Sequence, residues 1–151
     1  MTKPAASSSK RVLVIDDELS IVAYLTTVLE DEGYETCSAS DAEEALTVAR
    51  EQRPDLITLD IMMPKRSGVA LYQDLKLDPE LRGIPVIFIT AFSRTDDLWP
   101  AAFRRMVPDG SVPLPEAYLE KPIDVGVLLE TVTFLIRCAA SKSLADGGEA
   151  S

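Results

Sequence analysis

Asp60 is the residue around which a chemical site can be built. It follows an apolar run, Leu56–Leu59, in the segment LITLDIMMPKRSG, and such a run predicts a strand buried on both faces. Met63, Pro64 and Gly68 then indicate a loop. A carboxylate at the carboxyl end of a buried strand lies where open α/β sheets bind their ligands. The alternative interpretation is an aspartate that only caps the strand and faces water.

Three consecutive acids follow an earlier apolar run. Arg11–Ile15 (RVLVI) predicts a strand, and Asp16, Asp17 and Glu18 come directly after it. Adjacent like charges are electrostatically costly. One interpretation is a solvated acidic turn that leads into a helix, whose N-terminus favours anions. The other is a site for a divalent cation such as Mg²⁺, which binds carboxylate oxygens, and together with Asp60 we favour the metal.

Two further strand ends carry groups that suit a phosphoryl site. The apolar stretch 84–90 (IPVIFIT) ends in Thr90, and Ala91 follows. A threonine hydroxyl and the next backbone N–H can bind a phosphoryl oxygen, although threonine also simply favours strands. Lys121 follows the predicted strand 117–120 (AYLE). It is either an ordinary exposed lysine or the cation that pairs with the carboxylates.

Alternating strands and helices are predicted to position these residues. Ser20 is a candidate N-cap for a first helix, and Asp41 for a second. The closing helix carries apolar residues at spacings of three and four from Val125 to Ala139. Five strand–helix repeats predict a doubly wound α/β domain with a parallel sheet covered on both faces. We expect this domain at 11–140, with disordered tails at 1–10 and 141–151.

Composition argues against several classes of function. The net charge of −10, from 15 basic and 25 acidic residues, disfavours binding to nucleic acid or anionic lipid. The absence of histidine excludes Ser-His-Asp and Cys-His catalysis, histidine-ligated zinc and a role as histidine phosphodonor. Cys37 and Cys138 are expected to be small buried hydrophobic residues. Without a membrane-spanning apolar run or a signal-peptide core, we expect a cytoplasmic protein with no membrane insertion.

Several short motifs occur in a fixed order, each placed after a predicted strand. They are Asp16-Asp17, Asp60 with Met63-Pro64 and Gly68, Thr90-Ala91, and the run YLEKP from Tyr118 to Pro122. Over roughly residues 10–140 the chain thereby resembles the receiver domain of two-component response regulators, of the stand-alone, chemotaxis-regulator-like kind. The resemblance implies a flavodoxin-like (βα)5 fold with strand order 2-1-3-4-5, in which the functional strand ends meet in one crevice.

The resemblance also implies chemistry. Asp60 would accept a phosphoryl group from the phosphohistidine of a sensor histidine kinase or phosphotransfer protein, giving an aspartyl phosphate. Mg²⁺ would be bound by Asp17, Asp60 and the backbone carbonyl of Met62, with Asp16 behind these ligands or linked through water. Metal and lysine would supply the positive charge that transfer of an anionic group to a carboxylate needs. We therefore expect a signalling phosphoacceptor rather than an enzyme.

The remaining motif residues would form a switch. Thr90 and the amide of Ala91 would hold the phosphoryl oxygens, and Lys121 would pair with the phosphoacceptor or the phosphate. Tyr118 matches the switch aromatic, which turns inward when Thr90 moves toward the phosphate, and the bond before Pro122 would be cis. A downstream protein would then bind the face made by the fourth helix, the fifth strand and the fifth helix.

The chain departs from the family pattern in two places. The spacing from Thr90 to Lys121 is longer than expected, with the excess in 93–116; we expect this extended region to adapt partner binding, and the alternative is a neutral surface insertion. Met62 and Phe92 stand where polar residues would help to orient an attacking water. We therefore expect a long-lived aspartyl phosphate.

Two other functional classes share part of this pattern. Mg²⁺-dependent aspartyl phosphatases of the haloacid-dehalogenase type also combine an aspartate nucleophile with a threonine and a lysine. They need a second aspartate two residues after the nucleophile, where this chain has Met62. A phosphorylation-independent scaffold would keep the receiver-like fold without the switch, and metal-dependent phosphorylation would distinguish it.

Overall fold

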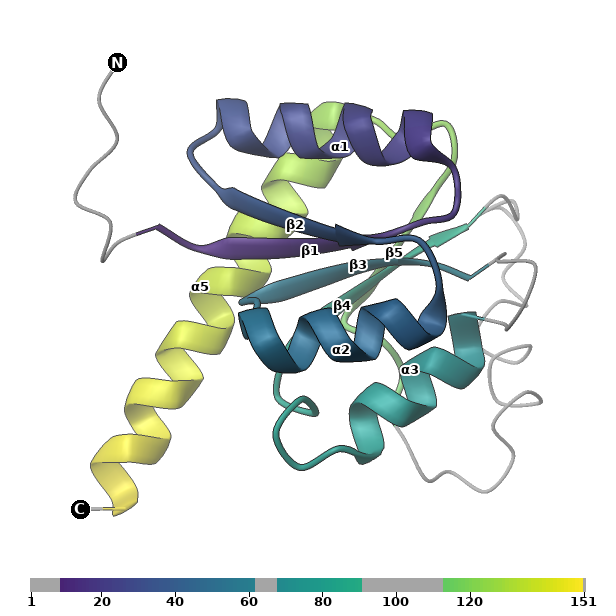
Figure 1. Ribbon diagram of the computed structural model, residues 1–151. Coiled ribbons are helices and arrows are strands. Elements are labelled where there is room, and N and C mark those ends of the chain that lie inside the picture. Colours follow the sequence, from purple (N-terminus) through teal and green to yellow (C-terminus); the bar gives the residue numbers. More distant parts are fainter. Residues whose placement is uncertain (1–8, 62–67, 91–112, 151) are drawn as a thin grey trace.

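One parallel five-stranded sheet with the order β2-β1-β3-β4-β5 organises the molecule. The computed structural model describes residues 9–61, 68–90 and 113–150, apart from the side chains of Thr90 and 142–150. The strands and helices (Figure 1) are β1 Arg11–Ile15, α1 Leu19–Asp31, β2 Glu35–Ala39, α2 Ala42–Gln52, β3 Leu56–Asp60, α3 Gly68–Leu77, β4 Val86–Thr90, β5 Ala117–Glu120 and α5 Val125–Ala150. The predicted doubly wound fold and its strand order are confirmed.

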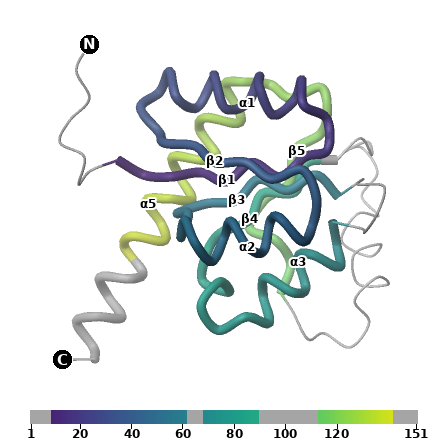
Figure 2. Tube along the Cα trace, in the orientation of Figure 1, coloured from purple at the N-terminus to yellow at the C-terminus, as the bar shows by residue number. Residues whose placement is uncertain are grey.

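Each face of the sheet carries its own apolar layer, because successive residues of a strand point to opposite faces. One face packs against α2 and α3 and includes Leu13, Ile15, Ile57, Leu59 and Phe88. The other packs against α1 and α5 and includes Val12, Val14, Leu56, Ile87 and Ile89. Figure 2 shows these helix pairs on the two sides of the sheet. The central strands are therefore buried on both faces, as their uninterrupted apolar runs predict.

The first two helices begin in different ways. Asp41 is the N-cap of α2 and accepts a hydrogen bond from the N–H three residues later, as predicted (2.8 Å). Ser20 is not the N-cap of α1, because that helix already begins at Leu19 and its N-cap is Glu18. The chain turns into the helix early because the Asp16 carboxylate accepts the N–H of Glu18 (2.9 Å).

The C-terminal helix α5 spans Val125–Ala150. The expected disordered tails at 1–10 and 141–151 stay predictions. Cys138 is exposed rather than buried, because it lies on the outer face of α5. Within the described residues no helix, α5 included, combines the length and apolarity needed to cross a bilayer.

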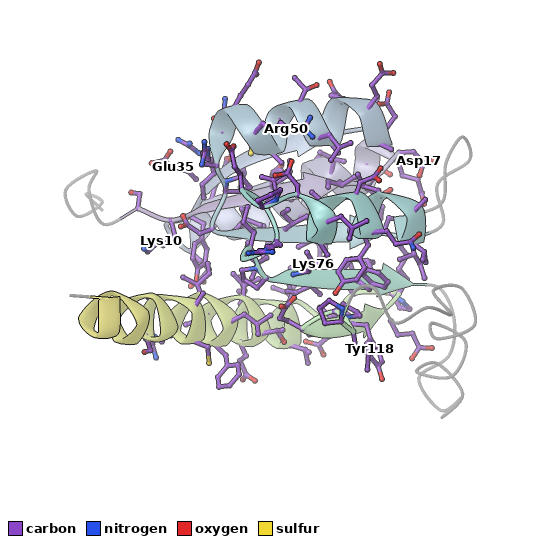
Figure 3. All side chains as sticks on the ribbon, turned by 90° about the horizontal axis from the view of Figure 1, so that it is seen from below. Lys10, Asp17, Glu35, Arg50, Lys76 and Tyr118 are labelled. Atoms are coloured by element: carbon purple, nitrogen blue, oxygen red, sulfur yellow. The ribbon has the colours of Figure 1, made fainter. Side chains whose placement is uncertain are left out.

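A buried lysine joins α3 to the start of β4 and β5. The Nζ of Lys76 donates to the carbonyl oxygens of Arg82 (3.2 Å) and Ile84 (3.1 Å) and pairs with Glu116 (3.4 Å). The other Glu116 oxygen accepts the N–H of Val86 at 2.8 Å. Lys76 lies between α3 and the sheet (Figure 3). This arrangement satisfies a charge that would otherwise be expensive to bury, and it fixes α3 relative to the two strands.

Gly68 allows α3 to begin directly against the end of β3. Its N–H donates to the carbonyl of Ile61 at 3.2 Å. A Cβ atom at this position would overlap the Cα of Ile61 and lie 2.7 Å from the carbonyl oxygen of Asp60. The neighbouring atoms belong to the backbone, so they cannot move aside as a flexible side chain would.

We predict that Gly68→Ala lowers the free energy of unfolding by about 2 kcal/mol, because the added methyl group forces α3 away from β3. Reversible urea unfolding measures the loss. Gly83→Ala is the matched control, since a Cβ there meets no described atom within 4 Å. Equal losses in the two variants would show that the close approach at Gly68 does not constrain the fold.

Candidate functional site

Three carboxylates meet at the carboxyl ends of β1 and β3. Asp16 and Asp60 are 1% and 2% exposed, and Asp17 is exposed beside them. β1 and β3 are paired neighbours, with Ile15 opposite Leu59, so the next residue on each strand enters the same crevice. One oxygen atom from each carboxylate lies within 4.8 Å of the others. Figure 3 shows Asp17 at this edge of the sheet and Lys10 at the opposite edge.

Asp16 is the most electrostatically strained member of this group. Its Oδ1 accepts the N–H of Glu18, whereas its buried Oδ2 has no hydrogen-bond partner among the described residues. Burial first, and then the nearby charge of Asp60, raise the pKa of Asp16 to about 6. Two unit charges about 4.8 Å apart repel by about 3.5 kcal/mol at an effective dielectric constant of about 20. The crevice therefore favours a cation.

Lys121, directly after β5, faces this negative charge. Its Nζ lies 3.5 Å from Asp60 Oδ2, 3.6 Å from Asp16 Oδ2 and 3.6 Å from Glu18 Oε1. Partial burial acts to lower the pKa of Lys121, but the three carboxylates outweigh it and raise that pKa above its ordinary value. One ammonium group is thus shared among three carboxylates.

The three aspartates fit a small divalent cation. Carboxylate oxygens are the ligands that hard ions such as Mg²⁺ prefer, and the three carboxylates are close enough to share one ion. The buried Asp16 Oδ2 has no hydrogen-bond partner among the described residues, and its ion pair with Lys121 is long at 3.6 Å, so this oxygen can accept a closer positive charge. The residues at this edge of the sheet are therefore chemically suited to bind Mg²⁺.

The other predicted site residues lie on the adjoining strands. Thr90 ends β4, and its Cα pairs with that of Glu120. Tyr118 pairs with Phe88 in the same register and packs, partly buried, on the α2–α3 side of the sheet. The Lys121–Pro122 peptide bond is cis. Met62, Ala91, Phe92 and the segment 93–112, including the predicted fourth helix, lie outside the described residues.

Two contacts were not predicted from the sequence. The sequence marks Glu18 only as part of an acidic run, whereas its carboxylate reaches Lys121 in the structure. Sequence reasoning gives Lys76 no role, although it is buried and bonded to three groups. A sequence signal for Lys76 does exist, because it lies four positions after the buried Tyr72 and hence on the same helix face.

Comparison with known proteins identifies the family. A family model described as the response regulator receiver domain matches residues 12–133. This chain belongs to that family. The polar-differentiation response regulator DivK of Brucella anthropi is 39% identical over 123 residues, covering 82% of this chain and 93% of that protein. The predicted resemblance is confirmed, and the chain is a receiver domain of two-component signalling, a family whose members are signalling phosphoacceptors rather than conventional enzymes.

Solved receiver structures share the fold. A CheY-like response regulator receiver domain protein from Methanospirillum hungatei aligns with a TM-score of 0.73 and 29% identity, covering 89% of this chain and 99% of that one. The chemotaxis protein CheY4 of Vibrio cholerae aligns with a TM-score of 0.70 and 26% identity, covering 85% and 99%. The likeness extends over nearly the whole of both structures.

We predict that Asp16→Asn stabilises the metal-free receiver by about 1 to 2 kcal/mol at pH 7.5. The shift from 3.8 to about 6 corresponds to roughly 3 kcal/mol against the ionised form, and loss of the partner of Lys121 reduces the gain. Because the pKa of Asp16 is higher in the folded state, ionisation of Asp16 lowers the free energy of unfolding. This loss grows as pH rises from about 4 to above 6.

The measurement is urea unfolding of both proteins in the presence of a chelator, from pH 5 to pH 7.5. The difference in free energy of unfolding between Asp16→Asn and wild type should grow with pH. It should shrink when Mg²⁺ replaces the chelator. Asp31→Asn, at an exposed position at the end of α1, should change stability by less than about 0.5 kcal/mol. A wild-type receiver more stable than Asp16→Asn at pH 7.5 without metal would contradict this account of the site.

Proposed function

We propose that this receiver accepts a phosphoryl group on Asp60 from the phosphohistidine of a sensor histidine kinase or phosphotransfer protein in the cytoplasm. The observation that carries the proposal is the surroundings of Asp60. Its carboxylate ends the buried strand β3, with Lys121 Nζ 3.5 Å from Oδ2 and two further aspartates within reach of the same ion. A carboxylate placed beside a cation at the open end of a sheet is suited to act as a nucleophile toward phosphorus.

In the proposed reaction an Asp60 oxygen forms a bond to phosphorus while the P–N bond of the phosphohistidine breaks. The electron pair of the broken bond remains on the imidazole nitrogen of the donor. Lys121 needs only a small movement to follow the incoming phosphoryl oxygens, because its Nζ is already 3.5 Å from Asp60 Oδ2. Its charge stabilises the negative charge on the transferred group.

Asp17, Asp60 and the carbonyl of Met62 would hold Mg²⁺, with Asp16 beside them. The ion would supply the positive charge that lets an anionic phosphoryl group approach this cluster of carboxylates. The close spacing of the three aspartate side chains supports this assignment. The Met62 carbonyl is assigned from the family resemblance.

The signal would leave the site through the neighbouring strands. We assign Thr90 and the amide of Ala91 to the phosphoryl oxygens, and Tyr118 to the switch that follows Thr90. The support is topological: β4 pairs with β5, and Tyr118 lies opposite Phe88, two residues before Thr90. A downstream protein would then bind the surface formed by β5, α5 and the segment between β4 and β5.

We predict one phosphoryl adduct per chain after incubation with acetyl phosphate and Mg²⁺, detected by intact-mass spectrometry. Acetyl phosphate tests the acceptor without requiring knowledge of the kinase. The adduct should be absent in Asp60→Asn and in chelator-treated protein, and it should persist in Asp31→Asn, which removes an exposed carboxylate distant from the site.

An adduct that persists in Asp60→Asn would place the acceptor elsewhere. Absence of an adduct with acetyl phosphate and also with a phosphorylated histidine kinase would favour the phosphorylation-independent scaffold.

A further inference from the structure

Glu18 occupies a helix position without performing the usual role of that position. It is the N-cap of α1, yet its side chain makes no capping hydrogen bond to the described backbone. N-cap residues are usually Ser, Thr, Asp or Asn, whose short side chains accept an N–H of the first turn. The longer Glu18 side chain instead places Oε1 3.6 Å from Lys121 Nζ. The start of α1 lies beside the connection from β5 to α5 (Figure 1).

Glu18 differs from the other carboxylates that share this lysine. The distances from Lys121 Nζ to Asp16, Asp60 and Glu18 are nearly equal, at 3.5 to 3.6 Å. The side chains of Asp16 and Asp60 are 1% and 2% exposed, whereas that of Glu18 is 58% exposed. When Lys121 moves away from Glu18, water can solvate the exposed Glu18 carboxylate at little cost in free energy. A buried aspartate that lost the lysine would instead remain as an unpaired charge.

We propose that Glu18 is a positioning residue that holds Lys121 toward the mouth of the crevice and so slows phosphorylation of Asp60. Lys121 serves the transfer only when its ammonium group turns toward the phosphoryl oxygens. While Lys121 is paired with Glu18, less of the positive charge of Lys121 faces the incoming phosphoryl group. The inference rests on the proposed function of Asp60 and adds a residue that regulates its rate.

The rate of phosphorylation by acetyl phosphate at saturating Mg²⁺ tests the proposal. Glu18→Gln keeps the length of the side chain and removes its charge. It should raise the second-order rate constant about two- to fivefold, the range expected for an exposed ion pair. Glu43→Gln, which removes an exposed acid in the first turn of α2, should leave the rate unchanged.

Glu18→Asp separates contact with Lys121 from simple repulsion of the anionic donor. Aspartate retains the charge, but its shorter side chain cannot reach the lysine and suits the N-cap of α1. If Glu18 acts by holding Lys121, this variant should react as fast as Glu18→Gln. It should also show a higher midpoint of thermal unfolding than wild type, because α1 gains a cap.

The outcomes distinguish this inference from the proposed function. A Glu18→Asp variant as slow as wild type, beside a fast Glu18→Gln, would mean that Glu18 only repels the donor and would overturn the positioning role. Equal rates in all three proteins would also overturn it, while leaving Asp60 as the acceptor. A wild-type protein that is not phosphorylated on Asp60 would overturn both proposals.

Discussion

The mutual repulsion of Asp16, Asp17 and Asp60 is the constraint on which this receiver depends. The fold holds their oxygens within 4.8 Å of one another and buries two of the three side chains. The resulting negative charge destabilises the metal-free protein and, for the same reason, favours binding of a cation. Lys121 relieves this repulsion only in part, since its ammonium group is also shared with Glu18. The site is therefore suited to bind a metal ion. The positive charge of that ion would in turn allow an anionic group to approach the carboxylates.

The sheet keeps these charges together because the strands that carry them are its central members. β1 and β3 are adjacent, and helices cover both of their faces, so their carboxyl ends cannot separate without exposing the core. Gly68 brings α3 against the backbone of Asp60. Lys76 and Glu116 join α3 to the starts of β4 and β5. The energetic cost of the site is thus offset by hydrophobic packing on both faces.

The sequence predicted what depends on local pattern. Apolar runs that end in Asp16 and Asp60 indicated buried strands with functional ends, and the motif order indicated the family. Contacts between distant segments were harder to predict. No local sequence pattern indicates that the Glu18 side chain contacts Lys121 instead of capping α1. Ser20 was a plausible cap, but the hydrogen bond from the Glu18 N–H to Asp16 starts the helix earlier.

Isothermal titration calorimetry with Mg²⁺ tests the central claim most directly, because it measures the affinity of the charge cluster for a cation without any phosphodonor. The account predicts saturable binding of one ion per chain, weakened at least tenfold by Asp60→Asn. It also predicts tighter binding in Lys121→Met, because the lysine competes with the ion for the same carboxylates. Absence of saturable binding, or an affinity unchanged by Asp60→Asn, would contradict the claim that these aspartates form a cation site organised around Asp60.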